Sequence, residues 1–208
     1  MTVHTLFFIR HAESEANKLR ILGSRLDYPL TKEGWDDARS IARELREMTG
    51  LDGIVTSPLR RARQTAETFA DSYGIKYEDD ERLCEQDLGP FTGKSYDEVK
   101  TMDAYQSDPS ARWDWYPGGS GESYSMVADR VRSFLGSVDG YRKGRWLIVT
   151  HAVVFRMLRA VLEDTLPIYP VGFPNNGEIW RVEYRGMGYQ HAIESVFLGR
   201  SREFVHKP

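Results

Sequence analysis

The sequence predicts a three-layer α/β/α fold around a mostly parallel central sheet. Short apolar segments alternate along the chain with longer segments of helical periodicity, the pattern of a layered α/β protein. The first apolar segment, residues 3–9, is apolar on both faces, as expected of a central parallel strand covered by helices. With 208 residues, 40% of them hydrophobic, the chain is long enough for one substantial core. We therefore expect residues 1–208 to form a single domain.

The first predicted helix follows the strand over 3–9 after a polar segment. It begins at Lys32, with Thr31 as its N-cap. Its apolar positions recur at intervals of three and four and form one stripe: Ala38, Ile41, Ala42, Leu45 and Met48. This helix should cover one face of the sheet.

A second strand is expected over 53–56, with a helix directly after it. Ser57 and Pro58 have the residue types of an N-cap and a first-turn proline, and the helix should run to about Ser72. Arg61 then lies in its opening turns.

The second half of the chain continues the alternation. The predicted elements are a short helix capped by Ser95 with Glu98, a helix over 123–138, a strand over 145–150, a helix over 153–162, and terminal strands over 178–184 and 190–197. Residues 95–121 differ, because aromatic side chains crowd there beside a glycine-rich run without clean periodicity. We expect this stretch to be an excursion over the active-site edge of the sheet. Trp113, Trp115 and Tyr116 within it serve either packing or substrate recognition.

Composition excludes several classes of function. With a net charge of -3, the chain has no excess of basic residues that would indicate binding to nucleic acid. The single cysteine, Cys84, excludes an internal disulfide, and we expect it to be a buried, inert thiol. No cluster of Cys and His residues has the spacing of metal ligands. No leader pattern is present, and no apolar run approaches the ~20 residues of a membrane span. We expect a cytoplasmic enzyme without a metal; its oligomeric state stays open, a homodimer included.

Polar side chains gather where three predicted strands end. Arg10 and His11 follow the first strand, Arg61 opens the helix after the second, and His151 follows a later one. Ligands of open α/β sheets bind beyond the carboxyl ends of the strands. The planar fork of arginine matches phosphate oxygens, and a helix N-terminus adds backbone donors. These residues predict a site for a dianion, most simply a phosphoryl group.

Phosphoryl transfer needs a nucleophile, charge stabilisation and a proton for the leaving oxygen. A neutral imidazole can be the nucleophile when its other nitrogen is held as a donor, so that the attacking lone pair faces the substrate. Glu85, in a short segment after an expected strand, is the best candidate for the acid.

Five segments carry a family resemblance. They are RHAESEAN at 10–17, SPLRRARQTA at 57–66, Glu85 before the Asp-Leu-Gly at 87–89, GES at 121–123, and VTHA at 149–152. Together and in this order they closely resemble the histidine phosphatase superfamily, also called phosphoglycerate mutase-like. The resemblance spans essentially the whole chain and implies the phosphoglycerate mutase-like form of the α/β/α fold.

The resemblance implies roles for individual residues. His11 is similar to the histidine that becomes phosphorylated, with Arg10, Arg61 and His151 as the pocket for the phosphoryl group. Glu85 falls where the phosphatase branch keeps its proton donor. A substrate-binding set is implied as well: Asn17, Ser24, Ala152 and Asn176. No cofactor is implied.

Two positions depart from the common form of the family. Ala12 and Ala152 stand where many members have glycine after each histidine. A methyl group narrows the pocket floor slightly, while the backbone donors and acceptors remain. We expect modest effects on geometry.

The leading hypothesis is a cofactor-free phosphomonoesterase that acts on a small phosphorylated substrate or a phosphoprotein. The alternative is a phosphoglycerate mutase, and a noncatalytic module that binds a phosphorylated ligand ranks third. The compact stretch after Glu85 favours the phosphatase. The non-phosphate half of the substrate is open; the candidates to meet a second anionic group are Arg20, Arg25, Lys94 and Arg112.

Overall fold

The computed structural model describes residues 4–141, 144–168, 170 and 172–199. Its strands form one sheet in the order β3-β2-β4-β1-β5-β6. Their bounds are β1 His4–Arg10, β2 Gly53–Thr56, β3 Tyr77–Asp79, β4 Arg145–Thr150, β5 Ile179–Tyr184 and β6 Glu194–Phe197. Strands β1 to β4 run parallel to one another, whereas β5 pairs antiparallel with both β1 and β6. The predicted mostly parallel sheet is confirmed.

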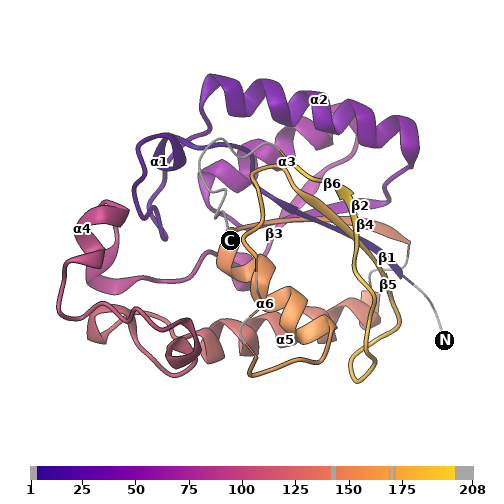
Figure 1. Ribbon diagram of the computed structural model, residues 1–208. Helices are drawn as coiled ribbons and strands as arrows, with labels where there is room; N and C mark the ends of the chain where they lie inside the picture. The colour runs from indigo at the N-terminus through magenta and orange to yellow at the C-terminus, as the bar shows by residue number, and fades with distance from the viewer. Residues whose placement is uncertain (1–3, 142–143, 169, 171, 200–208) are drawn as a thin grey trace.

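Helices cover both faces of this sheet (Figure 1). The α-helices are α1 Glu15–Lys18, α2 Lys32–Met48, α3 Arg60–Tyr73, α4 Tyr96–Lys100, α5 Tyr124–Tyr141 and α6 Ala152–Leu162. Short 3-10 turns lie between them: η1 Glu81–Leu83, η2 Gly89–Phe91, η3 Pro109–Arg112 and η4 Pro117–Gly119. Among the described residues, no helix has both the length and the apolar character that a membrane span needs.

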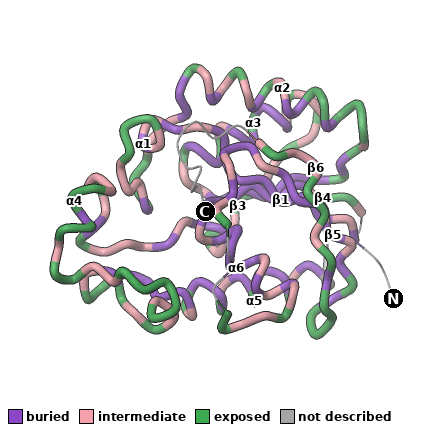
Figure 2. Tube along the Cα trace, viewed as in Figure 1, coloured by how far each residue is buried: buried purple, intermediate pink, exposed green. Residues whose placement is uncertain are grey.

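Strand β1 shows why the sheet is buried on both sides. Its side chains alternate, so that Phe7 and Ile9 join the core under α2 and α3, while Leu6 and Phe8 join the core over α5 and α6. All four are buried, and Figure 2 shows the strands as the buried centre of the molecule. Each such side chain contributes roughly 1.5–3 kcal/mol on burial. The continuous apolar run at 6–9 is thus the sequence signature of a two-sided core.

The register of the central strands brings the polar motifs together. Arg10 pairs with Thr150 at the ends of β1 and β4, and the amide of His11 donates to the Thr150 carbonyl at 2.9 Å. The amide of Ser57, just beyond β2, donates to the carbonyl of Val149 at 3.0 Å. The excursion with α4 lies beyond this carboxyl edge of the sheet (Figure 1), as predicted.

Two element boundaries were predicted wrongly. Helix α3 begins at Arg60 with Leu59 as its N-cap, so Ser57 is not the cap; its hydroxyl lies 2.7 Å from Nε2 of His151 instead. Strand β6 begins at Glu194 rather than at residue 190, because the amide of His191 donates to the carbonyl of Leu162 and ties this segment to α6.

Gly34, in the first turn of α2, should resist substitution although it lies in a helix. A Cβ at this position would meet the carbonyl oxygen of Glu13 well inside van der Waals contact, whereas Gly136 in α5 has open space, with Met187 Cγ at 3.9 Å. Gly34→Ala should lower the free energy of unfolding by about 1–3 kcal/mol through overpacking. Gly136→Ala should raise it by about 0.5–1 kcal/mol through helix propensity. Urea denaturation of both variants measures this, and a stabilised Gly34→Ala would contradict the described packing.

Candidate active site

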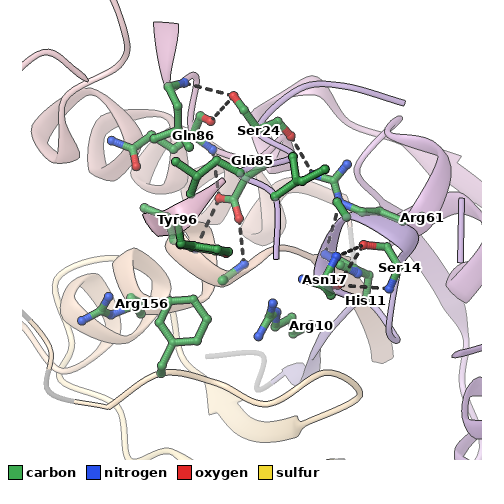
Figure 3. Close-up of a pocket in the computed structure, with 18 of the residues that line it drawn as sticks. Arg10, His11, Ser14, Asn17, Ser24, Arg61, Glu85, Gln86, Tyr96 and Arg156 are labelled. Atoms are coloured by element: carbon green, nitrogen blue, oxygen red, sulfur yellow. Dashed lines mark hydrogen bonds between the residues drawn. The ribbon is translucent and has the colours of Figure 1, made fainter. Parts of the chain in front are cut away.

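A cavity of about 180 Å³ opens at the carboxyl edge of the sheet (Figure 3). It contains most of the site residues that the sequence predicts: Arg10, His11, Asn17, Ser24, Arg61, Glu85 and Ala152. His151 and Asn176 are buried beside it and contact its walls. Residues from five separate parts of the chain therefore converge on one pocket.

His11 is buried and held in one orientation. Its Nδ1 lies 2.7 Å from the carbonyl oxygen of Ala12, and Arg61 donates from Nε to His11 Nε2 at 3.2 Å. Because a carbonyl can only accept, Nδ1 carries the proton and Nε2 carries the lone pair. Burial, and then the charges of Arg61 and Arg10, hold the pKa of His11 well below its ordinary value. The imidazole is therefore neutral at physiological pH.

Two buried guanidinium groups flank this imidazole. Arg61 donates to the carbonyl oxygens of Leu26 at 2.9 Å and Ser24 at 2.7 Å, which fixes its plane. Arg10 donates to the carbonyl of Pro174 at 2.6 Å. Burial lowers the pKa of Arg61 to about 10, so it stays cationic at neutral pH. Neither arginine forms an ion pair within the part of the chain that the structure describes, and two buried cations that lack a paired carboxylate favour an anionic ligand.

His151 lies behind the pocket wall, at the N-cap of α6. Its ring centroid is 5.1 Å from that of His11, and its Nε2 contacts the Ser57 hydroxyl at 2.7 Å. Nδ1 is buried and has no hydrogen-bond partner among the described residues. Burial, followed by the charge of Arg61, lowers the pKa of His151 well below its ordinary value. This ring too is neutral.

The carboxylate of Glu85 sits on the N-terminus of α6. It accepts hydrogen bonds from the amides of Ala152 at 3.1 Å, Val153 at 3.3 Å and Gln86 at 2.9 Å. An acidic group at a helix N-terminus interacts favourably with the helix dipole. Hydrogen bonds from α6, the helix that follows His151, thus hold the Glu85 side chain in the lining of the pocket (Figure 3).

The asparagines and the serine that we predicted as substrate-binding residues hold the pocket wall. Asn176 donates to the carbonyl of His11 at 2.9 Å and to Oδ1 of Asn17 at 3.2 Å. Asn17 also closes a capping box with Ser14 at the start of α1. The hydroxyl of Ser24 donates to the carbonyl of Gln86 at 2.9 Å. Their direct contact with substrate stays a prediction.

The two alanines that replace family glycines fit the packing. The methyl group of Ala12 is buried against Leu30 and Ala38, in a small cluster under α2. The amide of Ala12 donates to Thr65 Oγ1 at 3.1 Å, and the amide of Ala152 donates to Glu85 at 3.1 Å. The backbone groups on which the site depends are in use at both positions.

Sequence reasoning missed several pocket residues, namely Tyr96, Tyr124, Arg156 and Phe173. Arg156 had one available signal, because it lies four residues after Ala152 and so on the same face of α6. The tryptophans of the excursion pack instead: Trp113 lies edge-on to Tyr124 with centroids at 6.3 Å, and Trp115 contacts Phe91. Neither lines the pocket, and Tyr116 is half exposed.

Comparison with known proteins identifies the family. The histidine phosphatase superfamily (branch 1) matches residues 6–192, so the chain belongs to that superfamily. Phosphoserine phosphatase 1 of Hydrogenobacter thermophilus is 34% identical over 165 residues, covering 76% of this chain and 75% of that protein. Phosphoglycerate mutase-like protein 4 of Arabidopsis thaliana is 32% identical over 205 residues, covering 91% of this chain and 87% of that protein.

Solved structures agree on the fold. A mycobacterial glucosyl-3-phosphoglycerate phosphatase superposes with a TM-score of 0.82 at 24% identity, covering 92% of this chain and 98% of that one. YhfR of Bacillus stearothermophilus superposes with a TM-score of 0.76 at 30% identity, covering 93% and 95%. The names of these relatives include both phosphatases and a mutase-like protein, so they do not separate the two activities.

Within the described residues, no group of three or more His, Cys, Asp or Glu side chains is placed to hold a metal ion.

The two neutral histidines should make stability depend on pH. Their pKa values are depressed in the folded chain and return to about 6.5 on unfolding. Below about pH 6.5 the unfolded chain therefore binds more protons, and the free energy of unfolding falls as pH falls, by up to about 1.4 kcal/mol per pH unit for each histidine. In urea denaturation, His11→Gln should show a shallower pH slope than wild type below about pH 6.5 and the same slope above about pH 7.5. Equal slopes throughout would mean that His11 is not held neutral.

Proposed function

We propose that this protein is a phosphomonoesterase that works through a covalent phosphohistidine on His11 and needs no cofactor. One observation carries the proposal. A neutral imidazole is fixed by the Ala12 carbonyl, and its Nε2 lone pair lies beside Arg61 in a pocket that also holds a carboxyl group. A fixed lone pair next to a cation is the arrangement that in-line attack on a phosphoryl group requires.

In the first step, Nε2 of His11 attacks phosphorus and the bond from phosphorus to the ester oxygen breaks. Arg10 and Arg61 stabilise the charge on the equatorial oxygens, and the buried Nδ1 of His151 supplies a further hydrogen bond. Phosphate oxygens displace the Nε contact of Arg61 to His11 as they bind. Glu85, protonated at this stage, gives its proton to the departing alkoxide.

In the second step, water attacks the phosphohistidine. Glu85, now a carboxylate, takes one proton from the water, and the bond between nitrogen and phosphorus breaks to release phosphate and neutral His11. The N–H groups of α6 keep the carboxylate in place between the two steps. Each bond that forms is matched by one that breaks, and the enzyme returns to its starting state.

Hydrolysis rather than mutase activity is supported by the chain after Glu85. The end of this stretch pairs with Leu22, near the start of the chain. The amide of Gly93 donates to the carbonyl of Leu22 at 2.8 Å, and the amide of Leu22 donates to the carbonyl of Lys94 at 2.9 Å. The stretch between Glu85 and Lys94 is therefore compact, which supports hydrolysis. The cavity of about 180 Å³ lies below the roughly 300–1,000 Å³ of drug-sized ligand pockets, which favours a small phosphoester over a phosphoprotein.

The covalent intermediate is directly testable. Brief incubation with a ³²P-labelled phosphomonoester and an alkaline quench should leave label on the protein that is stable to alkali and lost in acid, as a phosphoramidate is. His11→Ala should carry no label and lose at least about 10³-fold in kcat. Active enzyme without label would contradict the mechanism. Interconversion of 3-phosphoglycerate and 2-phosphoglycerate faster than phosphate release would show a mutase, and binding of phosphoesters without turnover would show a noncatalytic module.

Proton donation by Glu85 predicts a dependence on the leaving group. Glu85→Gln should lower kcat for alkyl phosphates by about 10²–10⁴-fold. The rate of enzyme phosphorylation by p-nitrophenyl phosphate should fall much less, because p-nitrophenolate leaves without a proton. Stopped-flow measurement of the nitrophenolate burst isolates that step, and Glu81→Gln, an exposed carboxylate four residues earlier, is the matched control. Equal losses with both leaving groups would remove Glu85 from the role of acid.

A further inference from the structure

His151 is the second histidine of the site, and only one of its ring nitrogens has a partner. Nε2 lies 2.7 Å from the hydroxyl oxygen of Ser57, whereas Nδ1 is buried and has no hydrogen-bond partner among the described residues. Burial, followed by the charge of Arg61, keeps the pKa of His151 well below its ordinary value, so the ring is neutral and carries one proton. Either nitrogen can hold that proton. Its position decides what Nδ1 offers to a ligand.

A phosphoryl group needs a donor at Nδ1 of His151. The two histidine rings have centroids 5.1 Å apart, so a phosphoryl group bound at His11 lies beside the ring of His151. A protonated Nδ1 donates a hydrogen bond to an oxygen of that group, whereas a bare Nδ1 presents a lone pair to a dianion and repels it. The tautomer with its proton on Nδ1 is therefore the one that the phosphoryl site requires.

Ser57 lies between β2 and α3, where its hydroxyl can act as the donor toward His151. The residue is fully buried, and its amide donates to the carbonyl of Val149 at 3.0 Å, which fixes it beside the end of β4. The amide of Leu59 donates to Oγ of Ser57 at 3.3 Å. Oγ thus accepts one hydrogen bond from the backbone and still has its own proton to donate. Which neighbour receives that proton sets the tautomer of His151.

Cys84 is the competing neighbour of the Ser57 hydroxyl. Its thiol is protonated, because burial and then the Glu81 carboxylate raise the pKa of Cys84 to about 11. Sγ donates that proton to Oε2 of Glu81 at 3.3 Å, so toward Ser57 the sulfur can only accept. A thiol sulfur is a weak acceptor, whereas the unprotonated nitrogen of an imidazole is a full one. The hydroxyl of Ser57 therefore donates to Nε2 of His151, and the ring proton stays on Nδ1.

We propose that Ser57 is a positioning residue that fixes the tautomer of His151. Its hydroxyl holds the proton on Nδ1 before any ligand arrives, so that Nδ1 is ready to donate to a phosphoryl oxygen. Ser57 acts only through the imidazole, because it does not line the cavity. The inference rests on the proposed function for the nature of the ligand, a phosphoryl group. Its tests by spectroscopy and by phosphate binding are independent of turnover.

¹⁵N NMR of histidine-labelled protein at pH 7 locates the proton. In wild type without ligand, His151 should give a pyrrole-type signal from Nδ1 and a pyridine-type signal from Nε2, and His151→Gln assigns the pair by its disappearance. In Ser57→Ala the two signals should move toward each other, because both tautomers are then populated. Inorganic phosphate should return the ring of the variant to the form protonated on Nδ1 and should leave the tautomer of wild type unchanged.

Calorimetry with inorganic phosphate measures the consequence for binding. The Kd of Ser57→Ala should rise by the reciprocal of the fraction of molecules that keep the Nδ1 proton, about 2–10-fold for fractions of about a half to a tenth. Ser57→Thr keeps the hydroxyl and should retain both the tautomer and the affinity of wild type. Thr68→Val is the matched control, because it removes another buried hydroxyl of α3, one that donates to the carbonyl of Thr65 at 2.7 Å. It should change neither quantity.

The outcomes separate this role from a structural one. If Ser57→Ala does not fold, Ser57→Cys replaces it, since a thiol is a weak donor on a side chain of similar shape. A proton on Nε2 of His151 in wild type, or an unchanged tautomer in the folded variant, would overturn the role of Ser57. A weaker affinity for phosphate without a change of tautomer would also overturn it. A missing phosphohistidine with both effects intact would overturn the proposed function and leave the role of Ser57 standing.

Discussion

The hydrogen bond from His11 Nδ1 to the carbonyl oxygen of Ala12 is the interaction on which the site depends. It fixes the ring and places the proton on Nδ1, so the lone pair must be on Nε2. Burial and the charges of Arg61 and Arg10 then keep the ring from taking a second proton. Without that carbonyl the imidazole could rotate or change tautomer, and the arginines would face a ring with no defined direction of attack.

The rest of the fold holds this arrangement. Strand register sets the backbone of His11 against Thr150, and the segment after α6 returns to the same place, where Pro174 accepts from Arg10 and Asn176 donates to the carbonyl of His11. Buried cations are costly by themselves, so a site of this kind needs a rigid, well-packed frame on both faces of the sheet. The charged pocket therefore depends on the apolar strands that pack beneath it.

Sequence reasoning succeeded where the information is local. The apolar run followed by Arg10 and His11 predicted both the strand and the end of it at which the site lies. Similar local patterns predicted that Arg61, Glu85 and His151 lie at the same edge of the sheet. It failed at Ser57, because a serine before a proline has the residue type of an N-cap whether or not its hydroxyl has a stronger partner. That partner, His151, is 94 residues away along the chain. Arg156 and Phe173 were missed for the same reason, since only tertiary packing brings them to the cavity.

The protonation state of His11 is the central claim, and ¹⁵N NMR of histidine-labelled protein measures it most directly. At pH 6, without ligand, the account predicts that His11 gives one pyrrole-type signal from a protonated Nδ1 and one pyridine-type signal from an unprotonated Nε2. His11→Gln assigns the pair by its disappearance. Two protonated nitrogens on His11 at this pH, or a proton on Nε2 with Nδ1 bare, would contradict the account.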